Sequence, residues 1–168
     1  MVELAEMIAE SRSEGLLDPE EHMRLSRALQ IRNRVAGDVG VPLAAIRTVA
    51  AAAAGTGPRV ADIEQALAST GYSRFPVVDE AGAFIGFVHI KDILDLIDHP
   101  GAVVSASAVR YLPRLPAATP LPDALSGLRQ NHSHLALLTD ADGTVSGLLA
   151  LEDLVEDVVG TVRDGVHR

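Results

Sequence analysis

The chain has 168 residues, a formal net charge of −9, no cysteine and only 3% aromatic residues. The acidic balance argues against nonspecific binding to nucleic acid or to anionic lipid, because both depend on a basic surface. The lack of cysteine excludes disulfide bonds and thiolate metal sites, and no apolar run approaches the roughly 20 residues that span a bilayer.

Two helices are predicted in the first part of the chain. Residues 2–14 form the first. Asp18 is placed to cap the second, with proline at its first position and Glu21 at the capping-box position, so a helix is expected over residues 19–32. We expect residues 1–35 to be a helical lead-in to two further domains.

Residues 36–100 are predicted to form a first unit of strands and helices. A short strand is expected at residues 46–49, followed by a loop, and a helix face is marked by Val60, Ile63 and Leu67. Apolar residues 75–78 and 84–89 predict a hairpin. The final helix of the unit is predicted from an amphipathic stripe at helical spacing, formed by Ile90, Ile93, Leu94 and Ile97.

Residues 101–168 repeat this order. A helix face at residues 121–128 precedes a predicted hairpin of residues 135–138 and 144–149, and an apolar stripe over residues 151–159 predicts the final helix. Each unit therefore reads strand–helix–strand–strand–helix. The predicted fold class is α+β, with two tandem β-α-β-β-α units after the lead-in.

Segments 72–94 and 132–155 repeat one pattern about sixty residues apart: strand, acidic glycine turn, strand, glycine, and a helix with Asp on its first turn. The repeat matches Ser73 with Ser133, Gly82 with Gly143, Gly86 with Gly147, and Asp92 with Asp153. Each unit is too small to bury its own sheet, so we expect them to pack face to face as a pseudo-two-fold pair with a cleft between them. Gly86 and Gly147 are expected at strand bends, where glycine relieves backbone crowding.

The paired pattern Gly86…Asp92 and Gly147…Asp153 resembles a tandem cystathionine-β-synthase (CBS) domain pair. More narrowly, YSRFPVV, GFVHIKDIL, SHLALLTDADGTVSGLLALEDLVEDVVG and the lead-in EGLLDPEEHMRL are similar to the cytoplasmic part of CorC/HlyC-type proteins, the hemolysin-like membrane proteins associated with Mg/Co efflux. This resemblance covers about residues 10–164. It implies a cytoplasmic, non-catalytic regulatory module that senses ATP, ADP or AMP, with Mg²⁺ as a companion ion. It also implies a homodimer and an upstream membrane transport domain, absent from this chain, to which the signal passes.

The resemblance also implies the residues of a nucleotide site. Asp153 and Asp92 would accept hydrogen bonds from ribose hydroxyls beside two helix N-termini, which favour anions. The second-unit motif is the one that the family associates with ATP. The helix caps that precede these aspartates are His89 and Ala150. The other implied residues, which would contact the adenine or the phosphates, are Val41, Pro42, Ser73, Arg74, Pro76, Ser133 and His134.

The chain departs from the family pattern in several places. Ala150 offers no side-chain hydrogen bond, whereas the family often has Ser or Thr at this cap. Leu43 stands where the family often has Arg, and Gly40 where Met is frequent. These departures support the alternative function, a structural dimerisation module that has lost nucleotide binding.

Simpler interpretations of the same residues remain open. Asp92 and Asp153 are also ordinary helix-start residues. His132 and His134 alternate along a predicted strand, but no further ligand is spaced to complete a metal site, so none is expected. The acidic pairs 152–153 and 156–157 suit a solvated helix face better than a Mg²⁺ site. No nucleophile–base arrangement and no phosphate-binding glycine loop is present, so a metal-dependent hydrolase is disfavoured and no enzyme is predicted.

Overall fold

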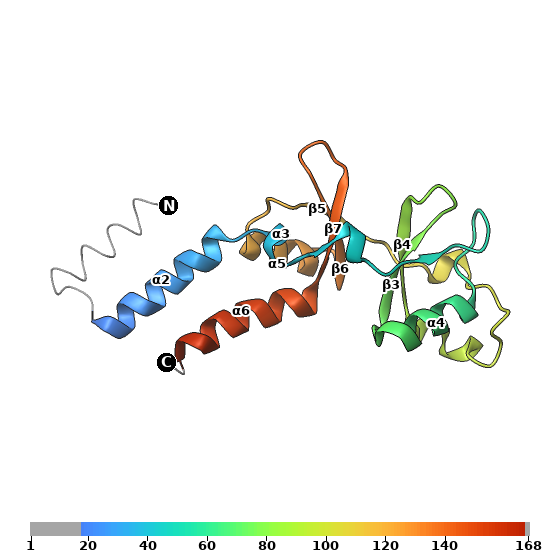
Figure 1. Cartoon of the computed structure of the whole chain (residues 1–168), viewed down its shortest axis with the longest axis horizontal. Coiled ribbons are helices and arrows are strands. Elements are labelled where there is room, and N and C mark those ends of the chain that lie inside the picture. The colour runs from blue at the N-terminus through green and yellow to red at the C-terminus, as the bar shows by residue number, and fades with distance from the viewer. Residues whose placement is uncertain (1–17, 167–168) are drawn as a thin grey trace. The chain divides into compact units, whose positions relative to one another are not determined.

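The computed structural model describes residues 18–166 and consists of two compact units. Unit 2 spans Ala45–Leu112, and unit 1 combines the chain before residue 45 with the chain from Pro113 onward (Figure 1). The units therefore divide the chain at other residues than the domains predicted over 36–100 and 101–168. The reason is that the segment before residue 45 supplies an edge strand to the sheet of the second repeat.

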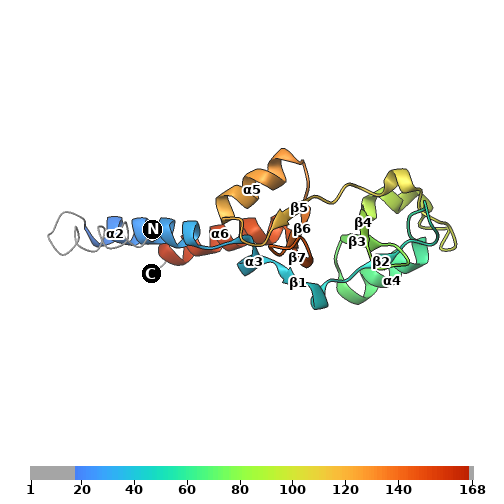
Figure 2. The same ribbon diagram turned by 90° about the horizontal axis from the view of Figure 1, so that it is seen from above.

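The lead-in of unit 1 contains helix α2 (Pro19–Asn33). The backbone N–H of Glu21 donates to Asp18 Oδ1 at 2.8 Å, so the predicted cap and the predicted helix over residues 19–32 are confirmed. The helix predicted over residues 2–14 lies outside the described residues. Within unit 1, α2 lies beside the last helix, α6 (Leu151–Val166) (Figures 1 and 2).

The sheet of unit 1 has the strand order β1-β7-β6-β5. Its strands are β1 (Val41–Pro42), β5 (Arg114–Pro116), β6 (Leu135–Thr139) and β7 (Val145–Ala150). The pair β5–β6 is parallel and the other two pairs are antiparallel. Helices α3 (Ala36–Val39) and α5 (Leu121–Gln130) pack with α6 over this sheet. The core of the unit is built from Ala36, Leu121, Ala124, Leu128, Ala136, Leu138, Leu149 and Leu154.

Unit 2 has a sheet of order β2-β3-β4. Strand β2 (Val49–Ala50) runs parallel to β3 (Arg74–Val78), which forms a hairpin with β4 (Phe84–His89). Helix α4 (Val60–Thr70) and the 3₁₀ helix η2 (Ile90–Leu96) pack on one common core with the sheet. Within residues 18–166 there are also two single-turn 3₁₀ helices, η1 (Leu43–Ala45), where unit 1 passes into unit 2, and η3 (Ala106–Ala108) in unit 2.

The predicted order strand–helix–strand–strand–helix is thus present twice, and the predicted α+β class is confirmed. One predicted strand is misplaced, because residues 46–48 are irregular and β2 begins only at Val49. The stripe at the end of the first unit also differs from the prediction, since η2 is a 3₁₀ helix with about three residues per turn. Ile93 is buried, whereas Leu94 is 59% and Ile97 47% exposed.

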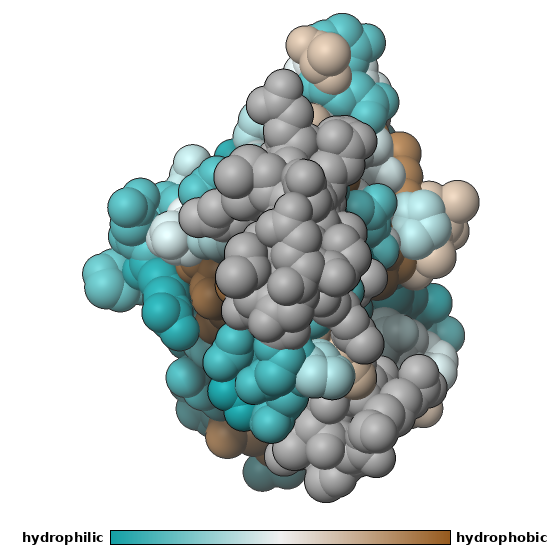
Figure 3. Space-filling view, turned by 90° about the vertical axis from the view of Figure 1, so that its left-hand side faces the viewer, coloured by the Kyte–Doolittle hydropathy of each residue, from teal (hydrophilic) through white to brown (hydrophobic). Residues whose placement is uncertain are grey.

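Among the described residues, no helix is long and apolar enough to span a bilayer. On the face shown in Figure 3, hydrophilic residues cover most of the described surface, and hydrophobic residues form small separate areas.

Candidate functional site

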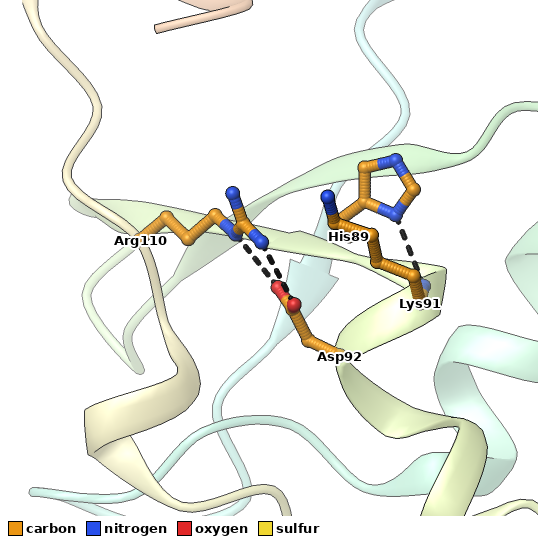
Figure 4. Close-up of polar contacts among 4 residues, drawn as sticks. All are labelled: His89, Lys91, Asp92 and Arg110. Carbon is orange, nitrogen blue, oxygen red and sulfur yellow. Dashed lines mark hydrogen bonds and ion pairs between the residues drawn. The ribbon is translucent and has the colours of Figure 1, made fainter. Parts of the chain in front are cut away.

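The first motif, which we define as residues 89–92, lies where β4 ends and η2 begins. His89 is the N-cap of η2, and its Nδ1 accepts a hydrogen bond from the backbone N–H of Lys91 at 3.0 Å (Figure 4). Because Nδ1 is an acceptor, the hydrogen of the neutral ring is on Nε2. His89 therefore replaces the usual cap residue of the family, as the sequence suggested, and keeps Nε2 as a donor.

The carboxylate of Asp92 is held by Arg110, a residue that precedes the second repeat. Arg110 Nε donates to Asp92 Oδ2 at 2.7 Å, and Nη2 donates to Oδ1 at 2.8 Å (Figure 4). Such a two-pronged arrangement matches the planar guanidinium to both carboxylate oxygens and is the strongest form of this ion pair. The Asp92 side chain is 20% and the Arg110 side chain 41% exposed.

These contacts change the protonation behaviour of the motif. The hydrogen bonds from Arg110 lower the pKa of Asp92 below its usual range, and the same pair raises the pKa of Arg110. The pKa of His89 is lowered, first by burial and then by the positive charges of Arg74 and Lys91. His89 is thus favoured in its neutral form, in a cationic surrounding.

The backbone of Arg110 is fixed as firmly as its side chain. The N–H of Arg110 donates to the Phe87 carbonyl at 2.7 Å, and the N–H of Phe87 donates back to the Arg110 carbonyl at 3.0 Å. In unit 1 the matching partner of β7 is β1, where Val41 pairs with Leu148 and Pro42 with Gly147. The sequence does not predict Arg110 as a site residue, although its position before the second repeat is equivalent to that of Val41 before the first.

The second motif, which we define as residues 150–153, lies where β7 ends and α6 begins. Ala150 provides no side-chain cap, and Asp153 is exposed on the first turn of a 16-residue helix. No described residue forms a hydrogen bond or ion pair with the Asp153 carboxylate. Its neighbour Glu152 lies 3.3 Å from His134, measured from Oε1 to Nδ1. The two predicted ribose-binding aspartates therefore have different surroundings, because Asp92 is paired and Asp153 is accessible.

The hairpin registers correct the repeat alignment by one residue. Arg74 lies opposite His89 in unit 2, and Leu135 lies opposite Ala150 in unit 1. Counted from these pairs, the equivalent of Ser73 is His134 rather than Ser133. The sequence matching of the two serines is wrong because one more residue separates Ser133 from its turn glycine.

Ser133 and its neighbours form a closed local turn rather than the start of a strand. The Ser133 side chain is buried, and its Oγ donates to the Leu135 carbonyl at 2.6 Å. His132 has a left-handed backbone with φ of 48°, and β6 begins only at Leu135. The prediction that His132 and His134 alternate along a strand is therefore wrong. Among the described residues, no three His, Asp or Glu side chains come together to hold a metal ion.

The remaining predicted residues lie on strands that neighbour the two motifs, Val41 and Pro42 on β1 and Pro76 on β3. Pro76 in β3 is buried, whereas Val41 in β1 is half-buried and Pro42 is exposed. Unit 2 also has a hollow of about 550 Å³ at the turn end of its hairpin, lined by residues such as Ala51, Asp79 and Val109. None of the predicted nucleotide-binding residues lines this hollow.

Comparison with known proteins shows the family of the chain. The CBS domain model matches residues 57–99 and 108–160. An uncharacterized protein of Mycobacterium tuberculosis strain H37Rv is 61% identical over 99% of this chain and 48% of its own length. The magnesium and cobalt efflux protein CorC of Pasteurella multocida is 27% identical over 96% of this chain and 53% of its length. The chain thus spans about half the length of these relatives.

Solved structures show the same fold. The CBS domain of a bacterial CNNM/CorC family Mg²⁺ transporter in complex with ATP has a TM-score of 0.71 and 24% identity, covering 84% of this chain and 99% of the other. The predicted resemblance to a tandem CBS pair is confirmed by the family model and by this neighbour. The chain belongs to the CBS domain family, as a tandem pair similar to the CBS regions of CorC-type proteins.

Proposed function

We propose that this chain is the non-catalytic, adenosine-nucleotide-sensing CBS pair of a membrane transport protein for divalent cations of the Mg/Co type, and that it works as a homodimer on the cytosolic side. The observation that carries the proposal is the Asp153 carboxylate, which is exposed at the start of α6. A long helix offers free N–H groups and a partial positive charge at its start, and the carboxylate offers acceptors for two ribose hydroxyls.

Two kinds of comparison support this proposal. A solved CBS domain of the same fold is in complex with ATP, and a relative of this chain is a magnesium and cobalt efflux protein. In the proposal, ATP, ADP or AMP is the ligand and Mg²⁺ accompanies the phosphates. Asp153 is assigned to the ribose in preference to Asp92, because Arg110 already forms hydrogen bonds with both oxygens of the Asp92 carboxylate.

The structure of unit 1 suggests how a signal passes from this site to an upstream domain. Asp153 and Asp157 lie one turn apart on α6. Asp157 accepts a hydrogen bond from Arg34, the residue directly after α2. A nucleotide that favours one position of the start of α6 would therefore act on the contact that holds the lead-in helix.

A ligand-free dimerisation module is the second candidate, and two observations favour it. Ala150 removes the hydroxyl that would cap α6 and contact a ligand. Apolar side chains on the last helices are exposed, among them Leu94 at 59% and Val159 at 42%. Such side chains are suited to a contact with a second copy of the chain.

Isothermal titration with ATP, ADP and AMP, with and without Mg²⁺, tests the proposal. We expect at least one nucleotide to bind, and we expect Asp153→Asn to lower its affinity at least tenfold. Asp123→Asn is the matched control, because Asp123 is also an exposed first-turn carboxylate in unit 1. Absence of binding at millimolar nucleotide would reject the sensor. A stable dimer in light scattering that does not respond to nucleotide would then favour the dimerisation module.

A further inference from the structure

We infer that the first motif is a seat for a phosphoryl anion formed by Arg110 and Lys91, and that Asp92 restrains Arg110 instead of binding ribose. The anion is the phosphate of a nucleotide if the proposed function holds, and a free polyphosphate otherwise. The inference concerns residues of unit 2 alone.

The first motif concentrates positive charge in an acidic protein. Lys91 is the sole lysine of a chain with a net charge of −9. Arg74, Lys91 and Arg110 all act on His89 and lower its pKa, and Arg74 lies directly opposite His89 in the β3–β4 pair. In Figure 4 the Lys91 side chain extends past His89 toward the same side of Asp92 as the Arg110 guanidinium. Lys91 and Arg110 thus place two cations beside the single carboxylate of Asp92.

The second motif has none of these charges at its equivalent positions. By hairpin register the equivalents of Arg74 and His89 are Leu135 and Ala150. The equivalent of Lys91 is Glu152, and the equivalent of Arg110 is Val41, which pairs with β7 as Arg110 pairs with β4. The two repeats thus share a backbone but differ in charge, and only the first motif offers side-chain cations to a phosphoryl group.

Asp92 is poorly placed to bind a sugar. Both of its oxygens accept hydrogen bonds from Arg110, and a ribose diol is neutral and cannot replace a guanidinium there at equal strength. A phosphoryl group can compete for the guanidinium, because it is an anion that pairs with arginine in the same planar geometry. The Asp92 carboxylate and the anion therefore compete for the Arg110 guanidinium. Removal of the Asp92 charge should strengthen anion binding, whereas removal of a ribose carboxylate would weaken nucleotide binding.

Titrations with pyrophosphate, ATP and adenosine in low salt without Mg²⁺ test this inference. We expect Asp92→Asn to raise the affinity for pyrophosphate at least threefold, and Arg110→Met to lower it at least tenfold. Adenosine affinity should stay within twofold in both variants. Arg59→Met is the matched control, because Arg59 is an exposed arginine of unit 2 at the N-cap of α4; it should change nothing.

Several results would overturn the inference. Weaker binding of adenosine and ATP by Asp92→Asn would show that Asp92 binds ribose. Unchanged pyrophosphate affinity in Arg110→Met would show that Arg110 does not bind the anion. If either variant fails to fold, Lys91→Met serves instead, because it leaves the Asp92–Arg110 pair intact and should still weaken pyrophosphate binding at least threefold; unchanged binding there also overturns the inference. Pyrophosphate binding without any ATP binding would support the seat while rejecting the nucleotide sensor. ATP binding that depends on Asp153, together with pyrophosphate binding that is independent of Arg110 and Lys91, would reject the seat alone.

Discussion

The backbone oxygen of Val41 lies 2.6 Å from the position that a β-carbon on Gly147 would occupy. The same arrangement recurs in unit 2, where the backbone oxygen of Arg110 meets the β-carbon position of Gly86. In both units a segment from outside the hairpin crosses the second hairpin strand at its glycine. These glycines are required because any side chain there would push this segment away.

Substitution of these glycines should therefore be costly. We expect Gly147→Ala to destabilise the protein by about 2 kcal/mol, because its methyl group meets a backbone atom that cannot rotate away. Gly86→Ala should cost at least as much, since the φ of Gly86 is 155° and adds backbone strain. Urea unfolding measures both effects. Gly101→Ala is the control, because nothing lies within 4 Å of its β-carbon position, and a loss there equal to that at Gly147 would contradict this explanation.

The Arg110–Asp92 pair should contribute measurable coupling to stability. A double-mutant cycle with Arg110→Met and Asp92→Asn should give a coupling free energy of about 1 kcal/mol, at the upper end for partly exposed pairs because two hydrogen bonds are formed. Chemical denaturation of the four proteins measures it. The pair Arg24–Glu20, which is exposed on α2, is the comparison and should give a smaller coupling of about 0.3 kcal/mol. Equal coupling in the two cycles would show that the geometry at Asp92 adds nothing.

His89 should make stability depend on pH below neutrality. Its pKa in the folded protein is lowered from 6.5, so the unfolded chain binds a proton more readily. The contribution of neutral His89 is complete above pH 6.5 and is lost as the pH falls through the folded pKa. We expect wild type to lose more stability than His89→Asn when the pH falls below 6.5, since Asn keeps the cap acceptor and does not titrate. Unfolding curves at several pH values measure this difference, and an NMR titration of His89 with a midpoint above 6.5 would contradict it.

Replacement of Ala150 by a residue that can cap α6 should increase the stability of the protein. A hydroxyl at this N-cap can accept a hydrogen bond from the free N–H groups at the start of α6, so Ala150→Ser should stabilise the protein by about 1 kcal/mol. Thermal unfolding measures the gain. Ala150→Val, which adds no acceptor, should give none. If the nucleotide proposal is right, the serine variant should also bind ATP more tightly than wild type.

Local patterns in the sequence predicted much of the fold because the forces that decide those elements are local. The cap at Asp18, the hairpins and the helix face of Val60 and Ile63 all follow from neighbouring residues, and the structure confirms them. The 3₁₀ geometry of η2 was not predicted, since an i, i+3 stripe fits either helix type. The serine alignment failed for a similar reason, because residue letters alone do not give the hydrogen-bond register.

The sequence by itself determined the duplicated α+β plan, the family, and the two aspartates at the start of their helices. Only the tertiary structure decided which of these carboxylates is accessible. Arg110 is 18 residues away from Asp92 in the chain, and it reaches that carboxylate because the segment before the second repeat pairs with Phe87 across the glycine of β4. An ion pair made by such a crossing depends on long-range backbone pairing, which no local pattern of residues encodes.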